Sequence, residues 1–270
     1  MHADLERRFG GLRRLYGDAG YARLRALRVA VVGLGGVGSW TAEALARSGV
    51  AQLVLIDFDH VAESNVNRQV QALGATLGQA KGQALRERIA DIHPGCDVQV
   101  VDEFVSPDNW PGLLPSAVDA VVDACDQVSA KVALAAWSLK VETPLVCVGA
   151  AGGKRAAQAV DVADLAQVSH DPLLAAVRQR LRQRHGAART GPMGVVCVFS
   201  REPVAQPTPE ACEPSPAGTA SGLQCADYGS SVMVTATFGL AAAGQAVEQA
   251  LARSAAASQP RQGTSAAATL

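Results

Sequence analysis

The chain has 270 residues, of which 49% are hydrophobic and 18% charged, and its formal net charge is −1. This balance is typical of a globular protein and excludes a disordered or collagen-like chain. A net charge near zero excludes a generic polycation that coats nucleic acid, and an aromatic content of 4% argues against an aromatic stacking platform for single strands.

The first half of the chain alternates apolar runs with helical patterns. Residues 1–26 are predicted to form a polar helical arm. Apolar, β-branched runs predict buried strands, and segments with helical spacing predict helices between them. The predicted strands are 28–33, 52–57, 98–101, 117–123 and 144–149, and the predicted helices are 39–48, 81–92 and 131–140. This alternation predicts an α/β, Rossmann-like fold, with a mostly parallel sheet and helices on both faces, over a core of residues 27–153.

The pattern changes after Gly153, where an appended C-terminal α+β region of residues 154–252 is predicted. Its predicted parts are a strand within 154–165, a basic helix at 172–185, a flexible loop at 201–224 and an apolar helix that includes 232–247. That apolar stretch is interrupted by polar residues, so we expect a buried core helix and no stable membrane insertion. Residues 253–270 are predicted to be a disordered tail.

The six cysteines are scattered and include no CxxC pair, so a structural zinc site of the usual spacing is not predicted. The N-terminus lacks the apolar segment of a signal peptide. We therefore expect free thiols and a cytoplasmic location. Cys197 and Cys225 are the candidate reactive thiols by position, and an inert, buried cysteine is the alternative for each.

A glycine-rich turn lies between the first predicted strand and its helix. Gly33-Leu-Gly-Gly-Val-Gly38 satisfies GxGxxG, a pattern that lets the backbone approach phosphate oxygens at a helix N-terminus. Asp57 ends the next strand, where a carboxylate can accept hydrogen bonds from a ribose. These two features alone favour a dinucleotide oxidoreductase.

The polar residues that follow favour nucleoside triphosphate chemistry instead. Arg68 offers a planar fork for phosphate, and Lys81 adds a mobile point charge at the start of the next helix. Asp126 follows a later strand and could hold magnesium. Each has a structural alternative: Asp59 could be a turn residue, Lys81 part of a solvated helix face, and Asp126 a helix N-cap.

The order of these motifs resembles that in the adenylating domain of the MoeB/ThiF/HesA family, whose members are relatives of the ubiquitin-activating enzymes. The motifs are, in order, GxGGxG, Asp-x-Asp, Asn-x-Asn-Arg-Gln, Lys81 and Asp126. The resemblance implies that residues 27–153 bind ATP and Mg²⁺ and adenylate a carboxylate. The implied nucleotide-binding residues are Gly33, Gly35, Gly36 and Gly38 for phosphate and the adenine side, Asp57 for ribose, Asn67, Arg68 and Lys81 for the polyphosphate, and Asp59 and Gln69 beside them. Arg68, Lys81 and Asp126 are the implied catalytic residues, with Asp126 as the metal ligand.

A narrower resemblance, to tRNA-modifying dehydratases of this family, extends over about residues 5–250 and departs from them in the loop 203–224 and the tail. It rests on segments such as Gly149-Ala-Ala-Gly-Gly153, Cys197-Val-Phe-Ser200 and Met233-Val-Thr-Ala-Thr-Phe-Gly239. The implied substrate is threonylcarbamoyladenosine in tRNA, whose threonine carboxylate takes AMP from ATP and releases pyrophosphate. The carbamoyl group of the same side chain then attacks and expels AMP, which closes a ring.

The resemblance also implies binding partners. We expect a homodimer in which an N-terminal arginine of one subunit, Arg8 or Arg14, reaches the ATP site of the other. A bound monovalent cation (Na⁺ or K⁺) is implied by analogy, as is a link to a cysteine desulfurase or sulfur-acceptor protein.

A basic cluster in the C-terminal region could contact tRNA phosphates. Its members are Lys154, Arg155, Arg178, Arg180, Arg182, Arg184 and Arg189. No acidic residue lies between Arg178 and Arg201, which favours a polyanion partner over a solvated helix face with acidic neighbours.

Three other functions compete with tRNA modification. An adenylyltransferase for a small ubiquitin-like or sulfur-carrier protein shares the first chemical step, but such relatives usually carry zinc cysteine pairs, which are missing here. A NAD(P)-dependent dehydrogenase explains only the glycine turn and Asp57. A non-enzymatic nucleotide sensor or sulfur-relay docking protein would bind without turnover.

Overall fold

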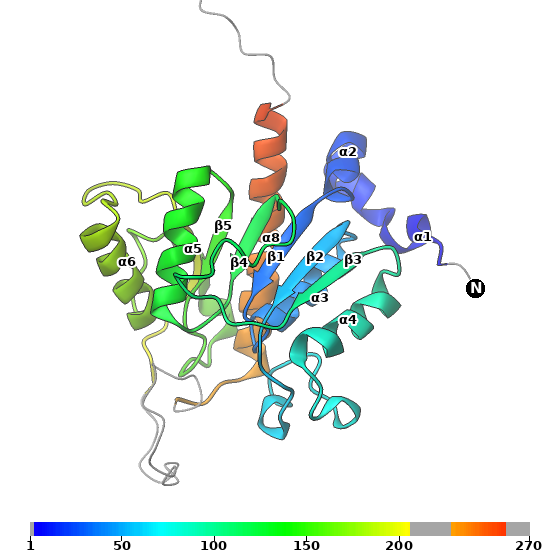
Figure 1. Cartoon of the computed structure of the whole chain (residues 1–270), viewed down its shortest axis with the longest axis horizontal. Helices are drawn as coiled ribbons and strands as arrows, with labels where there is room; N and C mark the ends of the chain where they lie inside the picture. Colours follow the sequence, from blue (N-terminus) through cyan, green and yellow to red (C-terminus); the bar gives the residue numbers. More distant parts are fainter. Residues whose placement is uncertain (1–2, 206–227, 258–270) are drawn as a thin grey trace, which may run out of the picture.

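The computed structural model describes residues 3–205 and 228–257 (Figure 1). Within them, seven strands form one sheet in the order β3-β2-β1-β4-β5-β7-β6. The strands are β1 (Arg28–Val32), β2 (Gln52–Ile56), β3 (Asp97–Val101), β4 (Ala120–Asp123), β5 (Leu145–Val148), β6 (Val160–Asp164) and β7 (Val196–Ser200). Every neighbouring pair is parallel except β6 with β7. The predicted mostly parallel α/β sheet is therefore confirmed.

Helices cover both faces of this sheet (Figure 1). They are α3 (Gly38–Arg47), α4 (Lys81–Ile92) and α8 (Val232–Ala257) on one face, and α5 (Val128–Val141) and α6 (Pro172–Arg184) on the other. Val29 and Val31 of β1 belong to the first core, whereas Ala30 and Val32 belong to the second. Successive side chains of a strand point to opposite faces, so a strand that is apolar throughout needs cover on both sides.

The C-terminal region extends the sheet. The strand expected within 154–165 is β6, which is the antiparallel edge strand. Its partner β7 was not predicted, because a five-residue run between a basic helix and a polar loop gives only a short signal. β7 lies parallel to β5, and this pairing joins the region to the core.

Helix α8 presents an apolar stripe to the first core. Val234, Phe238, Ala242 and Ala246 recur every four residues, and all four are buried. The helix continues to Ala257, so the prediction of disorder from residue 253 is wrong for 253–257. The rest of that tail, and residues 206–224 of the predicted loop, lie outside the described residues. No helix in the described part of the chain has the length and apolar character of a membrane span.

The N-terminal arm consists of two short helices, α1 (Leu5–Phe9) and α2 (Gly11–Leu24). The guanidinium of Arg8 donates to two carbonyl oxygens at the end of α4, each at 2.6 Å. Phe9 packs on His93, with ring centroids 4.7 Å apart, and the guanidinium of Arg25 lies over the Phe9 ring. A guanidinium nitrogen of Arg25 also lies 3.0 Å from Nε2 of His93.

Burial of His93, with the nearby charge of Arg25, lowers the pKa of its imidazole below the usual 6.5. The folded protein therefore binds this proton less readily than the unfolded chain, and stability is lost as the pH falls through 6.5 toward the lowered value. We predict that His93→Gln reduces the fall in unfolding free energy between about pH 7.5 and 5.5, as measured by urea unfolding. His60→Gln, at an exposed histidine, is the control. An equal pH dependence in wild type and His93→Gln would contradict this assignment.

Candidate active site

A cavity of about 390 Å³ opens at the carboxyl ends of β1, β2, β4 and β5, and we call it the strand-end pocket. Ligands of open α/β sheets bind at this edge, where the loops after parallel strands converge. The predicted site residues that line it are Gly33, Gly35, Gly36, Asp57, Asp59, Arg68, Gln69, Lys81 and Asp126. Three other predicted residues, Gly38, Asn67 and Arg14, are not among its lining residues.

The glycines of the first loop differ in what surrounds them. Gly33 has a φ of +82°, and a Cβ there would lie 2.8 Å from the amide nitrogen of Cys125. A Cβ on Gly38 would overlap the carbonyl oxygen of Gly33. These two glycines let the loop after β1 pack on the loop after β4 and on the start of α3. Gly35 has no atom within 4 Å of its Cβ position, which leaves its backbone open to a ligand.

Two carboxylates and one ammonium line the pocket beyond β2. Asp57 is buried and accepts the backbone N–H groups of Leu34 at 2.5 Å and Asp59 at 2.8 Å. Burial raises the pKa of Asp57, and the charge of Lys81 partly offsets this. Lys81 is only 6% exposed, and its Nζ lies 2.8 Å from the carboxylate of the exposed Asp59. The solvated-face alternative for Lys81 is therefore wrong, and its charge acts in a partly dehydrated pocket.

Arg68 is oriented by a small network. Its Nη1 donates to the carbonyl of Ser64 at 2.7 Å and to Oδ1 of Asn67 at 3.0 Å. Asn67 in turn donates to the carbonyl of Ser230 at 3.0 Å, and Thr235 donates to the Arg68 carbonyl at 3.4 Å. In this structure Asn67 positions Arg68 and connects it to the segment before α8.

Asp126 lies in the loop between β4 and α5 and is exposed. Its side chain makes no hydrogen bond or ion pair with any described residue, and the N-cap of α5 is Gln127, so the N-cap alternative is wrong. The described residues hold no group of three or more His, Cys, Asp or Glu side chains that could bind a metal. The exposed carboxylate of Asp126 fits Mg²⁺, which is usually held by one or two carboxylates together with waters and substrate phosphates.

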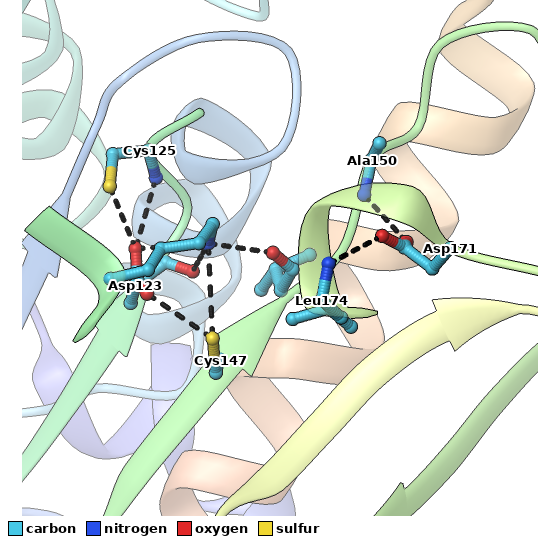
Figure 2. Close-up of polar contacts among 8 residues, drawn as sticks. Asp123, Cys125, Cys147, Ala150, Asp171 and Leu174 are labelled. Carbon is cyan, nitrogen blue, oxygen red and sulfur yellow. Dashed lines mark hydrogen bonds and ion pairs between the residues drawn. The ribbon is translucent and has the colours of Figure 1, made fainter. Parts of the chain in front are cut away.

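A buried ion pair joins Lys131 to Asp123 (labelled in Figure 2), which directly precedes the pocket residues Ala124 and Cys125. The carboxylate of Asp123 and the ammonium of Lys131 are 3.1 Å apart, and both side chains are 0% exposed. Burial is the largest single influence on the pKa of Lys131 and would lower it, but Asp123, Cys147 and Cys125 together raise the pKa above its usual value. Lys131 also donates to the carbonyl of Val148 at 2.7 Å, and Asp123 accepts the thiols of Cys125 at 3.0 Å and Cys147 at 3.3 Å. The pair therefore joins the ends of β4 and β5 to the first turn of α5.

Asp171 connects the loop after β5 to α6 (Figure 2). As the N-cap of α6 it accepts the amide of Leu174 at 2.9 Å, and it also accepts the amide of Ala150 at 2.8 Å. Burial raises the pKa of this carboxyl. Because Gly149 and Ala150 line the strand-end pocket, Asp171 fixes one wall of the pocket to the helix.

The predicted basic cluster divides in the structure. Lys154 is 2% exposed and donates to the carbonyls of His170 and Glu202, so its prediction as a tRNA contact is wrong. Arg178 and Arg182 also donate to backbone carbonyls of their own region. The four exposed members are Arg155, Arg180, Arg184 and Arg189.

The structure also bears on the candidate thiols and the N-terminal arginines. Cys197 is 0% exposed within β7, and Cys225 lies outside the described residues. Arg8 is engaged at the end of α4, whereas Arg14 on α2 is exposed and makes no hydrogen bond or ion pair with a described residue. Of the two predicted arginines, Arg14 is therefore the one whose side chain has no partner among the described residues.

Several pocket residues were not predicted as site residues. They are Glu103–Val105 after β3, Gly149–Ala151 after β5, and Ser230 and Thr235 near the start of α8. The rule that ligands bind beyond strand ends could have identified the first two groups. Ser230 and Thr235 reach the pocket through the packing of α8 on α3, for which the sequence carries no local signal.

The ThiF family model matches residues 9–264. The chain is 42% identical over 254 residues to the tRNA threonylcarbamoyladenosine dehydratase of Escherichia coli K12, which covers 92% of this chain and 95% of that relative. The structure of E. coli tRNA N6-threonylcarbamoyladenosine dehydratase, TcdA, in complex with ATP aligns with a TM-score of 0.83 at 40% identity, over 97% of this chain and 100% of that chain. The structure of the same enzyme in complex with AMP aligns with a TM-score of 0.84 at 40% identity. This alignment covers 95% of this chain and 99% of that chain.

The buried ion pair gives a stability prediction. Lys131→Met leaves Asp123 buried without its cation, and we expect a loss of roughly 3–5 kcal/mol in the free energy of unfolding. The double variant Lys131→Met/Asp123→Asn buries no unpaired charge and should lose clearly less than the single variant. Urea unfolding measures both. A single variant within about 1 kcal/mol of wild type would show that the pair does not hold the strand ends together.

Proposed function

This chain belongs to the ThiF family, and on that basis we propose that it dehydrates threonylcarbamoyladenosine in tRNA to a cyclic form, with release of AMP and pyrophosphate from ATP. The family resemblance inferred from the sequence motifs is confirmed. The observation that best supports this activity is the strand-end pocket. An open glycine backbone, two cations and the motif carboxylates lie there together at one edge of the sheet.

The chemistry follows from the weakness of a carboxylate as an electrophile. The threonine carboxylate of the substrate attacks the α-phosphorus of ATP, and pyrophosphate leaves. The carbamoyl group of the same side chain attacks the activated acyl carbon and gives up a proton, and AMP departs with the former carboxylate oxygen. The net change in the nucleoside is the loss of one water. Because the nucleophile belongs to the same molecule, its effective concentration at the acyl carbon is high.

Each pocket residue has a role that its surroundings support. The guanidinium of Arg68 and the ammonium of Lys81 would neutralise the polyphosphate as charge moves to the leaving group. Asp57 retains lone pairs for a ribose hydroxyl while it accepts two backbone N–H groups. Asp126 would hold Mg²⁺, which when bound shields the phosphate charge. The open backbone at Gly35 allows close approach of phosphate oxygens.

The alternatives explain fewer of these residues. A dehydrogenase leaves Arg68, Lys81 and Asp126 without a task. A carrier-protein adenylyltransferase shares the adenylation step, but 42% identity over 92% of the chain favours the tRNA substrate. A monovalent cation and a cysteine desulfurase or sulfur-acceptor partner stay predictions of the family resemblance.

We also propose a homodimer in which the arm of each subunit completes the ATP site of the other. The exposed, unengaged side chain of Arg14 supports this arrangement. An arginine supplied in this way would add a further cation to the polyphosphate site.

The exposed carboxylate of Asp126 allows a clean test of the metal role. We predict that Asp126→Ala lowers pyrophosphate release with substrate tRNA by about 100-fold or more, because the metal loses its protein ligand. The unfolding free energy should change little, since no described residue pairs with this side chain. Asp91→Ala, at an exposed carboxylate at the end of α4, is the matched control. A variant that keeps more than about half of the wild-type rate would contradict the role.

The shared site predicts complementation between two inactive variants. Arg14→Ala and Asp126→Ala homodimers should each be inactive. A mixed dimer contains one intact site, because the Asp126→Ala subunit supplies Arg14 to the other, so an equal mixture should recover about a quarter of the wild-type rate. The two variants are mixed and left to exchange subunits, and the rate of pyrophosphate release by the mixture is then measured. No recovery in mixtures shown to contain mixed dimers would place the arm in its own subunit's site.

A further inference from the structure

A second hollow, of about 310 Å³, lies between α5 and α6, and we call it the tryptophan–arginine hollow. Its lining comes from three segments: the chain between β3 and β4, one face of α5, and the end of α6. The residues used below are Trp110, Trp137, Arg180, Arg184 and His185.

The hollow combines two indoles with an unused donor. The rings of Trp110 and Trp137 meet edge to face, with centroids 5.2 Å apart. Trp110 is 8% exposed, and its indole N–H has no hydrogen-bond partner among the described residues. A buried N–H without a partner is uncommon, and an acceptor on a bound ligand would satisfy it. Although the overall aromatic content is low, the fold gathers two of the chain's three tryptophans at one place.

The two arginines that line the hollow form no ion pair with a described residue. Arg180 and Arg184 lie one turn apart on α6, so their side chains share a face. Both are exposed, and neither makes a hydrogen bond or ion pair with a described residue, unlike Arg178 and Arg182 on the same helix. His185 adjoins them, and no acidic residue lines the hollow. This lining suits an anionic group bearing a flat, apolar ring.

The same three segments contribute lining residues to both the hollow and the strand-end pocket. Between β3 and β4, Glu103–Val105 face the pocket and Trp110 faces the hollow. At the start of α5, Ala130 lines the pocket and Ser129 the hollow, and on α6 Leu173 lines the pocket and Arg180 the hollow. A polynucleotide whose reactive nucleoside enters the pocket would therefore place neighbouring nucleotides along this surface.

Resting on the proposed function, we propose that the tryptophan–arginine hollow binds a second nucleotide of the RNA substrate. Its base packs against the indoles, and Arg180 and Arg184 contact the adjoining phosphates. Stacking on an aromatic side chain tolerates any base, whereas the arginines contribute affinity that depends on salt. The hollow thus secures the RNA chain, and the strand-end pocket selects the modified nucleoside.

The test measures binding of tRNA carrying threonylcarbamoyladenosine, without ATP, at several salt concentrations. Arg180→Gln/Arg184→Gln should weaken binding about tenfold or more and reduce the salt slope by about two, since two phosphate contacts are lost. Trp137→Leu should weaken binding about tenfold and leave the salt slope unchanged. Arg86→Gln, at an exposed arginine of α4, is the matched control. ATP affinity should stay within about twofold of wild type in every variant, which shows that the strand-end pocket is intact.

The outcomes separate this inference from the proposed function. If the arginine variant binds tRNA with wild-type affinity and salt slope while the wild-type protein dehydrates it, the hollow is not an RNA site and the proposed function stands. If the wild-type protein binds this tRNA without dehydrating it, the proposed function fails, and the binding variants still decide the role of the hollow. The arginine pair lies on the surface, so this test does not depend on how well Trp137→Leu folds.

Discussion

The ion pair between Asp123 and Lys131 is the interaction on which the site depends. Two fully buried charges are costly unless each is satisfied, and here Lys131 also donates to the backbone at the end of β5 while Asp123 accepts two thiols. The pair thereby fixes the ends of two neighbouring strands and the first turn of α5. The loops that follow these strands carry Asp126 and Gly149–Ala151, which form one side of the strand-end pocket.

A second set of contacts connects these strand ends to the neighbouring loops and to α6. Gly33 allows the loop after β1 to rest on the loop after β4, and Asp171 joins the loop after β5 to α6. Helix α6 also packs beside α5, and its last turns contribute Arg180, Arg184 and His185 to the tryptophan–arginine hollow. On the proposed function, the strand-end pocket takes the reacting nucleotide, and the tryptophan–arginine hollow takes a second nucleotide of the RNA. This division suits an enzyme that modifies one nucleoside within a large RNA.

Sequence patterns predicted the parts of the fold that depend on local periodicity. Every strand except β7, the helices between them and the glycine turn could be predicted from short windows, and the order of motifs identified the family. The patterns failed where long-range packing decides. Lys154 looks like any other cation in the sequence, yet the fold buries it against backbone carbonyls. Ser230 and Thr235 reach the pocket from the far end of the chain, and Trp110 meets Trp137 only because α5 packs beside the loop after β3.

The central claim is that this chain removes water from threonylcarbamoyladenosine in tRNA by activating a carboxylate with ATP. The most direct test is mass analysis of the nucleosides of tRNA that carries this modification, after incubation with the purified protein, ATP and Mg²⁺. The account predicts that the modified nucleoside loses the mass of one water and that AMP appears in equal amount. An unchanged nucleoside, with pyrophosphate released only when a carrier protein is supplied, would contradict the account.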